Sequence, residues 1–174
     1  KGINPDVEKR LKNRMEQLAL ALWASVCGYQ DIKRLRVSNW LILGGFLISF
    51  VYLYVKESSL TGATVNMAMT ALFIGVCLSL PGYLLGRLGA ADVKYLAALG
   101  LASDPLTVLY SLAFGCLLCI ALFILVKLFK RSVEKSAMNE EVRLRRAPSK
   151  NKSFPFIFAM SAGLLAHLII SKII

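Results

Sequence analysis

Two aspartates, Asp31 and Asp92, stand at the ends of apolar runs in a chain that is otherwise mostly hydrocarbon. Asp31 follows the run 18–29, and Asp92 lies between the runs 64–85 and 95–99. An ionisable residue at a membrane boundary is costly to desolvate, so it is either a surface charge or a functional group. Two carboxylates that share one proton can bind a water between them. The ionised group then accepts a proton from the water, and the protonated group donates to a carbonyl under attack. Such a pair needs no metal or other cofactor.

The same two residues also allow a purely structural interpretation. Asp31 can balance the neighbouring Lys33 and Arg34, while Asp92 can cap a helix and face Lys94. Spacing along the chain does not separate this interpretation from the catalytic one, so both stay open at this point.

The composition indicates an integral membrane protein. Of the 174 residues, 57% are hydrophobic and 18% are charged, whereas soluble domains are about 45–50% apolar and about 25% charged. The net charge of +11 fits the lysine and arginine bias of cytoplasmic loops better than nucleic-acid binding. No cleavable signal peptide is expected, because no small-residue cleavage site follows the first apolar run.

The apolar runs predict an all-α polytopic membrane protein with about six transmembrane or membrane-embedded helices. Residues 1–17 are expected to form an amphipathic interfacial helix, and residues 18–174 one embedded domain with a cytoplasmic loop at 129–153. The expected segments are 18–29, 40–55, 64–85, 92–101, 106–128 and 155–174. The first and fourth are short, since about 20 residues are needed to span a membrane.

Both carboxylates are expected on one face of the membrane, because two spans separate Asp31 from Asp92 and return the chain to the same side. With six alternating segments, this side carries about twice as many lysines and arginines as the other. The bias predicts that the face is cytoplasmic. The basic residues within 9–14 fall on the opposite side and argue against this assignment for the N-terminus.

The residues around both aspartates resemble the type IV prepilin peptidases, a family of GxGD intramembrane aspartic peptidases. Residues 89–94, Gly-Ala-Ala-Asp-Val-Lys, are similar to the family's Gly-x-Gly-Asp-Val-Lys segment. Asp31 followed by Val-Ser-Asn at 37–39 is similar to its Asp…Ile-Pro-Asn loop, and the opening of the last run at 154–159 is similar to the Pro-Phe-rich start of its final helix. The resemblance extends from about residue 28 to residue 166. It is greatest to the short TadV/CpaA-like branch, which processes Flp-type pilins.

This resemblance implies an aspartic endopeptidase of type IV pilus assembly or secretion. The enzyme would remove the basic leader of prepilin or pseudopilin precursors at the cytoplasmic face of the inner membrane, with Asp31 and Asp92 as the catalytic pair. It implies no metal and no cofactor, and its partners would be the precursor and membrane lipid, not nucleic acid. Methyltransferase activity belongs to the long branch, whose cytoplasmic loop with paired Cys-x-x-Cys motifs this chain lacks. The residues expected to bind substrate or support the motifs are Asn39, Gly89, Ala91, Lys94 and Pro155.

Two motif positions depart from the family pattern. Ser38 replaces the loop proline, and Ala91 stands where the second motif glycine is expected. A methyl group at position 91 can limit how closely a substrate backbone approaches Asp92. The alternative is therefore a catalytically inactive relative that acts as a membrane assembly or scaffold protein. A small proton-coupled transporter would instead need acids near the membrane midplane and inverted repeats, and the sequence indicates neither.

Three other residues with reactive side chains are expected to be structural. Cys116 and Cys119 have the spacing of metal ligands, but no second pair accompanies them, so two small apolar side chains on one helix face are expected. His167 is the only histidine and lies within an apolar run, where a packed histidine is expected rather than a catalytic one.

Overall fold

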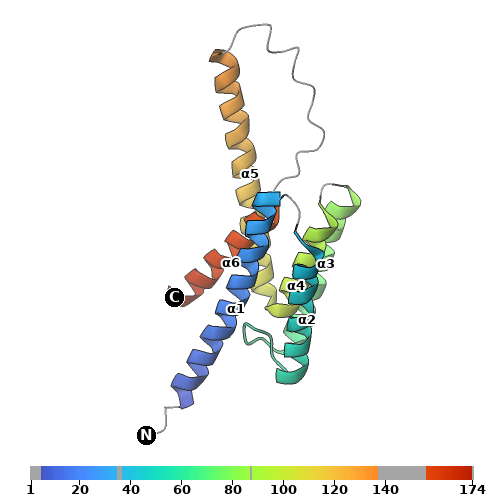
Figure 1. Ribbon diagram of the computed structural model, residues 1–174, viewed down its shortest axis with the longest axis vertical. Helices are drawn as coiled ribbons and strands as arrows, with labels where there is room; N and C mark the ends of the chain where they lie inside the picture. The colour runs from blue at the N-terminus through green and yellow to red at the C-terminus, as the bar shows by residue number, and fades with distance from the viewer. Residues whose placement is uncertain (1–4, 35–36, 87, 137–155, 174) are drawn as a thin grey trace.

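The computed structural model describes residues 5–34, 37–86, 88–136 and 156–173, and over these residues it contains helices and no strand (Figure 1). This confirms the predicted all-α class. The helices are α1 (Pro5–Arg34), α2 (Asn39–Lys56), α3 (Val65–Leu84), α4 (Ala90–Ala102), α5 (Pro105–Ser136) and α6 (Phe156–Ile173).

Three of these helices are long and apolar enough to cross a membrane, namely α2, α3 and residues 105–128 of α5. Trp40 and Tyr54, near the two ends of α2, are both 84% exposed. Tryptophan and tyrosine are enriched at the ends of membrane spans, because these ends lie at the membrane–water interfaces. A further apolar stretch covers residues 156–170 of α6. The protein is therefore a membrane protein.

The helix boundaries differ from the predicted segments at three places. α1 is one continuous helix from Pro5 to Arg34, so residues 5–17 and the first apolar run form a single element. α4 begins at Ala90, which puts Asp92 in its first turn rather than at its first position. α5 continues past residue 128 to Ser136, because residues 129–136 contain no glycine or proline to end it. The rest of the expected loop, from residue 137, lies outside the described residues.

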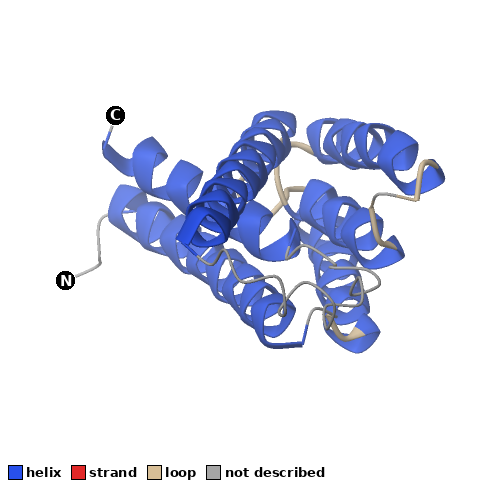
Figure 2. Ribbon diagram, turned by 90° about the horizontal axis from the view of Figure 1, so that it is seen from above, coloured by secondary structure: helices blue, strands red, loops and turns tan. Residues whose placement is uncertain are grey.

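The short helix α4 lies at the centre of the bundle, where it contacts α2, α3, α5 and α6 (Figures 1 and 2). Tyr95, Leu96 and Leu99 of α4 are fully buried. The ring of Tyr95 stacks on Trp23 of α1, with centroids 5.2 Å apart. A helix surrounded by other helices can be apolar on every side. This explains why the sequence of α4 is hydrophobic throughout although the helix is too short to span a membrane.

At the end of α4 opposite Asp92, Asp104 caps the first turn of α5. Its Oδ2 accepts a hydrogen bond from the backbone N–H of Thr107 (3.2 Å), and its Oδ1 accepts one from the Thr107 hydroxyl (2.6 Å). The hydroxyl of Thr61, in the α2–α3 loop, also donates to Asp104 Oδ1 at 3.3 Å. Asp104 therefore has a structural role at the end of the molecule remote from Asp31 and Asp92.

Candidate active site

The ends of α1 and α3 and the beginnings of α2, α4 and α6 lie at the same end of the helix bundle, beyond which α5 extends (Figure 1). Asp31 lies in the last turn of α1, and Asp92 lies in the first turn of α4. The antiparallel pair α2 and α3 returns the chain to this end between them. Both carboxylates are outside the three membrane spans, and the structure brings them to the same face of the bundle.

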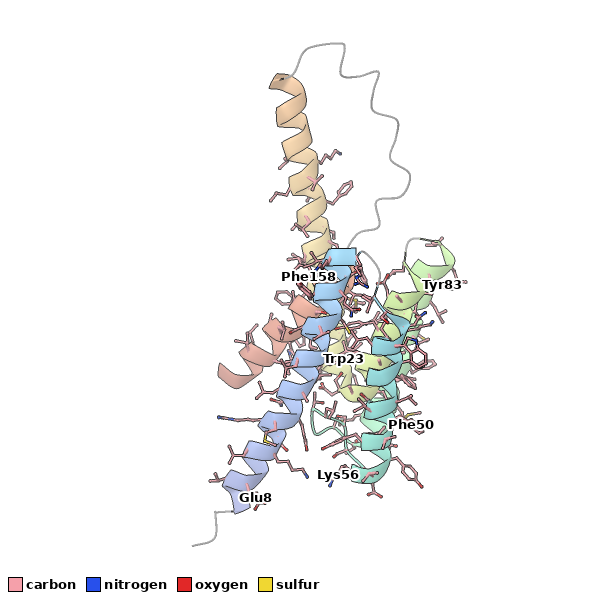
Figure 3. The ribbon with its side chains drawn as sticks, viewed as in Figure 1. Glu8, Trp23, Phe50, Lys56, Tyr83 and Phe158 are labelled. Atoms are coloured by element: carbon pink, nitrogen blue, oxygen red, sulfur yellow. The ribbon has the colours of Figure 1, made fainter. Side chains whose placement is uncertain are left out.

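Asp31 is buried, with 6% of its surface exposed. Its Oδ2 accepts a hydrogen bond from the backbone N–H of Phe158 at 3.1 Å, and Figure 3 shows Phe158 beside the end of α1. Burial raises the pKa of Asp31 above its ordinary value, while the N–H groups of Phe158 and Ile157 lower it. Desolvation is the largest of these effects, so the net pKa is raised.

Asp92 is half-buried and lies at the N-terminus of its own helix. Its Oδ2 accepts a hydrogen bond from the backbone N–H of Gly89, the N-cap residue of α4, at 2.8 Å. Burial raises the pKa of Asp92 to about 6; the Gly89 hydrogen bond lowers it, and the charge of Asp31 raises it. The charge of Asp31 thus acts on Asp92, although burial is the larger effect.

The structural interpretation of the aspartates holds only in part. Asp92 does cap α4, as that interpretation predicts, but only its Oδ2 makes this hydrogen bond. The cations assigned to balance the acids have other contacts: Lys33 lies over the ring of Tyr29, 5.8 Å from its centroid, and Lys94 donates to Asn39 Oδ1 at 3.4 Å. The capping of α4 therefore accounts for part of the placement of Asp92, but not for the buried carboxylate of Asp31.

The residues expected to support the motifs lie around this pair. Asn39 begins α2, and its contact with Lys94 joins α2 to α4 beside the site. Gly89 allows the Asp92 carboxylate to approach, because a Cβ at position 89 would lie 3.3 Å from Asp92 Oδ2. Pro155 lies outside the described residues.

Ala91 is partly buried and packs against the hydrophobic core. We expect the Ala91→Gly variant to leave the rate of any cleavage reaction unchanged, because the methyl group contacts the core. The free energy of unfolding should fall by at most about 1 kcal/mol, because glycine is a poor helix former. Rates and unfolding of both proteins in the same detergent measure the two effects. A large gain in cleavage by the glycine variant would instead show that the methyl group obstructs substrate.

Sequence reasoning missed the groups that hold Asp31 in place. The Phe158 donor is a backbone N–H, which every residue but proline carries, so no residue type signals it. The available signal was Gly28, a glycine one turn before Asp31. In the structure this glycine marks close packing, because a Cβ there would be 3.1 Å from the Ser161 side chain.

The histidine and the two spaced cysteines have no assigned role in the acid–base chemistry. His167 stacks on Tyr110 with ring centroids 4.7 Å apart, which agrees with the packed histidine expected from the sequence. Cys116 and Cys119 are free thiols on α5. Among the residues that the structure describes, no group of three potential ligands could hold a metal ion.

Apolar helices and two interacting carboxylates at one end of the bundle define a membrane protein whose site can perform acid–base chemistry. Residues 18–124, more than half of the chain and including both aspartates, match the type IV leader peptidase family. The chain therefore belongs to this family of peptidases, and the resemblance inferred from the motifs is confirmed. Comparison with curated proteins found no match. Comparison with solved structures found none either.

Proposed function

We propose that this protein is an intramembrane aspartic endopeptidase that removes the basic leader of type IV, Flp-like prepilin precursors. The observation that carries the proposal is the position of the two aspartates at the same face of the bundle, outside the three membrane spans, with Asp31 in the last turn of α1 and Asp92 in the first turn of α4. Burial and the charge of Asp31 raise the proton affinity of Asp92, and two nearby acids that share one proton supply an acceptor and a donor together. Membership of a leader peptidase family supports the same reaction.

In the proposed reaction, the ionised carboxylate takes a proton from a water molecule held between the two acids. The water oxygen then bonds to the carbonyl carbon of the scissile peptide, and the protonated carboxyl donates its proton to the carbonyl oxygen. Collapse of this intermediate breaks the C–N bond: the proton taken from water passes to the leaving amine, and one hydroxyl proton of the intermediate returns to the carboxylate that had donated to the carbonyl oxygen. The chain supplies both groups, so we propose a peptidase that uses no metal or cofactor and has no methyltransferase activity.

We also propose that the site faces the cytoplasm and that the membrane is the inner membrane. The end of the bundle that carries Asp31 and Asp92 also carries Lys33, Arg34 and Lys94, and an excess of lysine and arginine marks cytoplasmic ends of membrane helices. Flp-like precursors are proposed as substrates because the motif resemblance is greatest to the short branch of the family.

Leader removal from a co-expressed Flp-type precursor tests the proposal. We expect the protein in membranes to shorten the precursor at one site. The rate should fall as the pH rises through about 6, the pKa to which burial raises Asp92, because the pair then loses the proton it must donate. It should fall again at low pH, when both carboxyls are protonated and no acceptor remains. The measurements are the mass of the product, its new N-terminus and the initial rate at each pH.

Membranes without the protein provide the control for cleavage by other proteases. A rate that continues to rise above pH 6 would contradict an aspartic mechanism. Absence of product with several precursors, although the protein is inserted, would favour the inactive scaffold instead.

A further inference from the structure

The C-terminal helix α6 lies beyond residues 18–124, the stretch that matches the peptidase family, yet it contacts Asp31 directly. The Phe158 N–H that donates to Asp31 Oδ2 belongs to the first turn of α6. N–H groups in a first turn have no acceptor within their own helix, and the positive end of the helix dipole favours a negative charge beside it. The contact therefore favours an ionised Asp31.

The close packing of α1 on α6 sets the distance between Asp31 and this N–H (Figure 2). Gly28 lies three residues before Asp31, so the two share a face of α1. A Cβ at position 28 would lie 3.1 Å from Ser161 Cβ and 3.4 Å from Phe158 Cα. A glycine at this position lets α1 approach α6 until the Asp31 carboxylate reaches the Phe158 N–H.

α6 is also fixed to the neighbouring helices α4 and α5. The hydroxyl groups of Ser161 and Tyr95 are hydrogen-bonded at 3.2 Å, and Tyr95 lies one turn after Asp92 on α4. On the side of α5, the Ser111 hydroxyl donates to the Met160 carbonyl at 2.8 Å. Because α6 contacts both aspartate-bearing helices at buried positions, its first turn is held at a fixed place in the site.

We propose that the first turn of α6 is a positioning element, whose Phe158 N–H orients Asp31 and keeps it ionised as the proton acceptor, while Asp92 carries the shared proton. This inference rests on the proposed peptidase function and assigns different roles to the two acids. Asp31 receives N–H donors from a second helix, whereas Asp92 accepts from the N-cap of its own helix. The titratable groups that interact across the site are the Asp92 carboxyl of α4 and the Cys119 thiol of α5.

The test compares Phe158→Pro, which removes the N–H, with Phe158→Ala, which removes the same side chain and keeps the N–H. Proline is tolerated in the first turn of a helix because no helical hydrogen bond is lost there. Leader removal is measured as a function of pH. The low-pH limb is the acid side of the rate profile, where the rate falls as the proton acceptor becomes protonated. Its midpoint in the proline variant should lie about one pH unit above that in the alanine variant, because a hydrogen bond to a charged group lowers the pKa of that group by about one unit.

A purely structural role for the α6 contact would lower the rate by the same factor at every pH and leave the limbs in place. Coincident limbs in the two Phe158 variants would therefore overturn the inference. If the unmodified protein cuts no precursor, the proposed function fails, and the roles assigned here fail with it.

Gly28→Ala provides a second test if the proline variant does not insert. The added methyl group must displace the Ser161 side chain or separate the helices by a few tenths of an ångström, because 3.1 Å is too close for carbon–carbon contact. We expect a smaller shift of the low-pH limb in the same direction. An unshifted limb in Gly28→Ala would also overturn the inference.

Discussion

Asp31→Asn and Asp92→Asn are each expected to reduce leader removal by about 100-fold to 10,000-fold, the range that a positioned acid or base contributes. Asparagine has nearly the size of aspartate, and its carbonyl oxygen can still accept the N–H of Phe158 or Gly89. The substitutions therefore remove proton transfer while the helices stay packed. Initial rates in membranes, together with the amount of inserted protein, measure the effect.

Asp104→Asn is the matched control, because it makes the same chemical change at the opposite end of the bundle. Asp104 caps α5 and contacts Thr61 and Thr107, so its loss should affect stability more than rate. Equal losses of cleavage in Asp104→Asn and Asp92→Asn would indicate that the effect is destabilisation. Full activity in either Asp31→Asn or Asp92→Asn would show that the two acids do not act as a pair.

Much of this arrangement could be predicted from the sequence because hydrophobic periodicity and length constrain membrane helices strongly. The apolar run 64–85 gave α3 to within one residue at each end. The count of spans between Asp31 and Asp92 gave their common face. In both cases the physical constraint is local or topological: a helix must satisfy its own backbone groups in lipid, and each span reverses the direction of the chain.

The contacts between helices could not be predicted from the sequence, because each contact depends on how two segments far apart in the chain pack against each other. The stacking of Trp23 on Tyr95 joins α1 to α4, and nothing in either run indicates its partner. The helix α1, by contrast, extends through residues 5–17, where a helix was expected, because their lysines, arginines, glutamates and leucines are good helix formers.

Gly100→Ala is expected to destabilise the fold strongly, because the backbones of α4 and α3 lie close together at this glycine. A Cβ at position 100 would lie 2.6 Å from the Cα and 2.7 Å from the backbone N of Leu72, and 2.8 Å from the backbone carbonyl carbon of Ala71. Backbone atoms cannot rotate away as a side chain can, so one helix must move. Overpacking of this kind costs about 3 kcal/mol, and unfolding of the detergent-solubilised protein measures the cost.

Gly44→Ala is the matched control within a membrane span, because a Cβ at position 44 would meet no atom within 4 Å. Alanine there should stabilise α2 slightly, since it is the better helix former. The displacement caused by Gly100→Ala should also lower leader removal, because α4 carries Asp92 in its first turn. If Gly100→Ala were as stable as Gly44→Ala, α4 would not be packed against α3 as closely as the structure has it, and the position of Asp92 opposite Asp31 would lose its support.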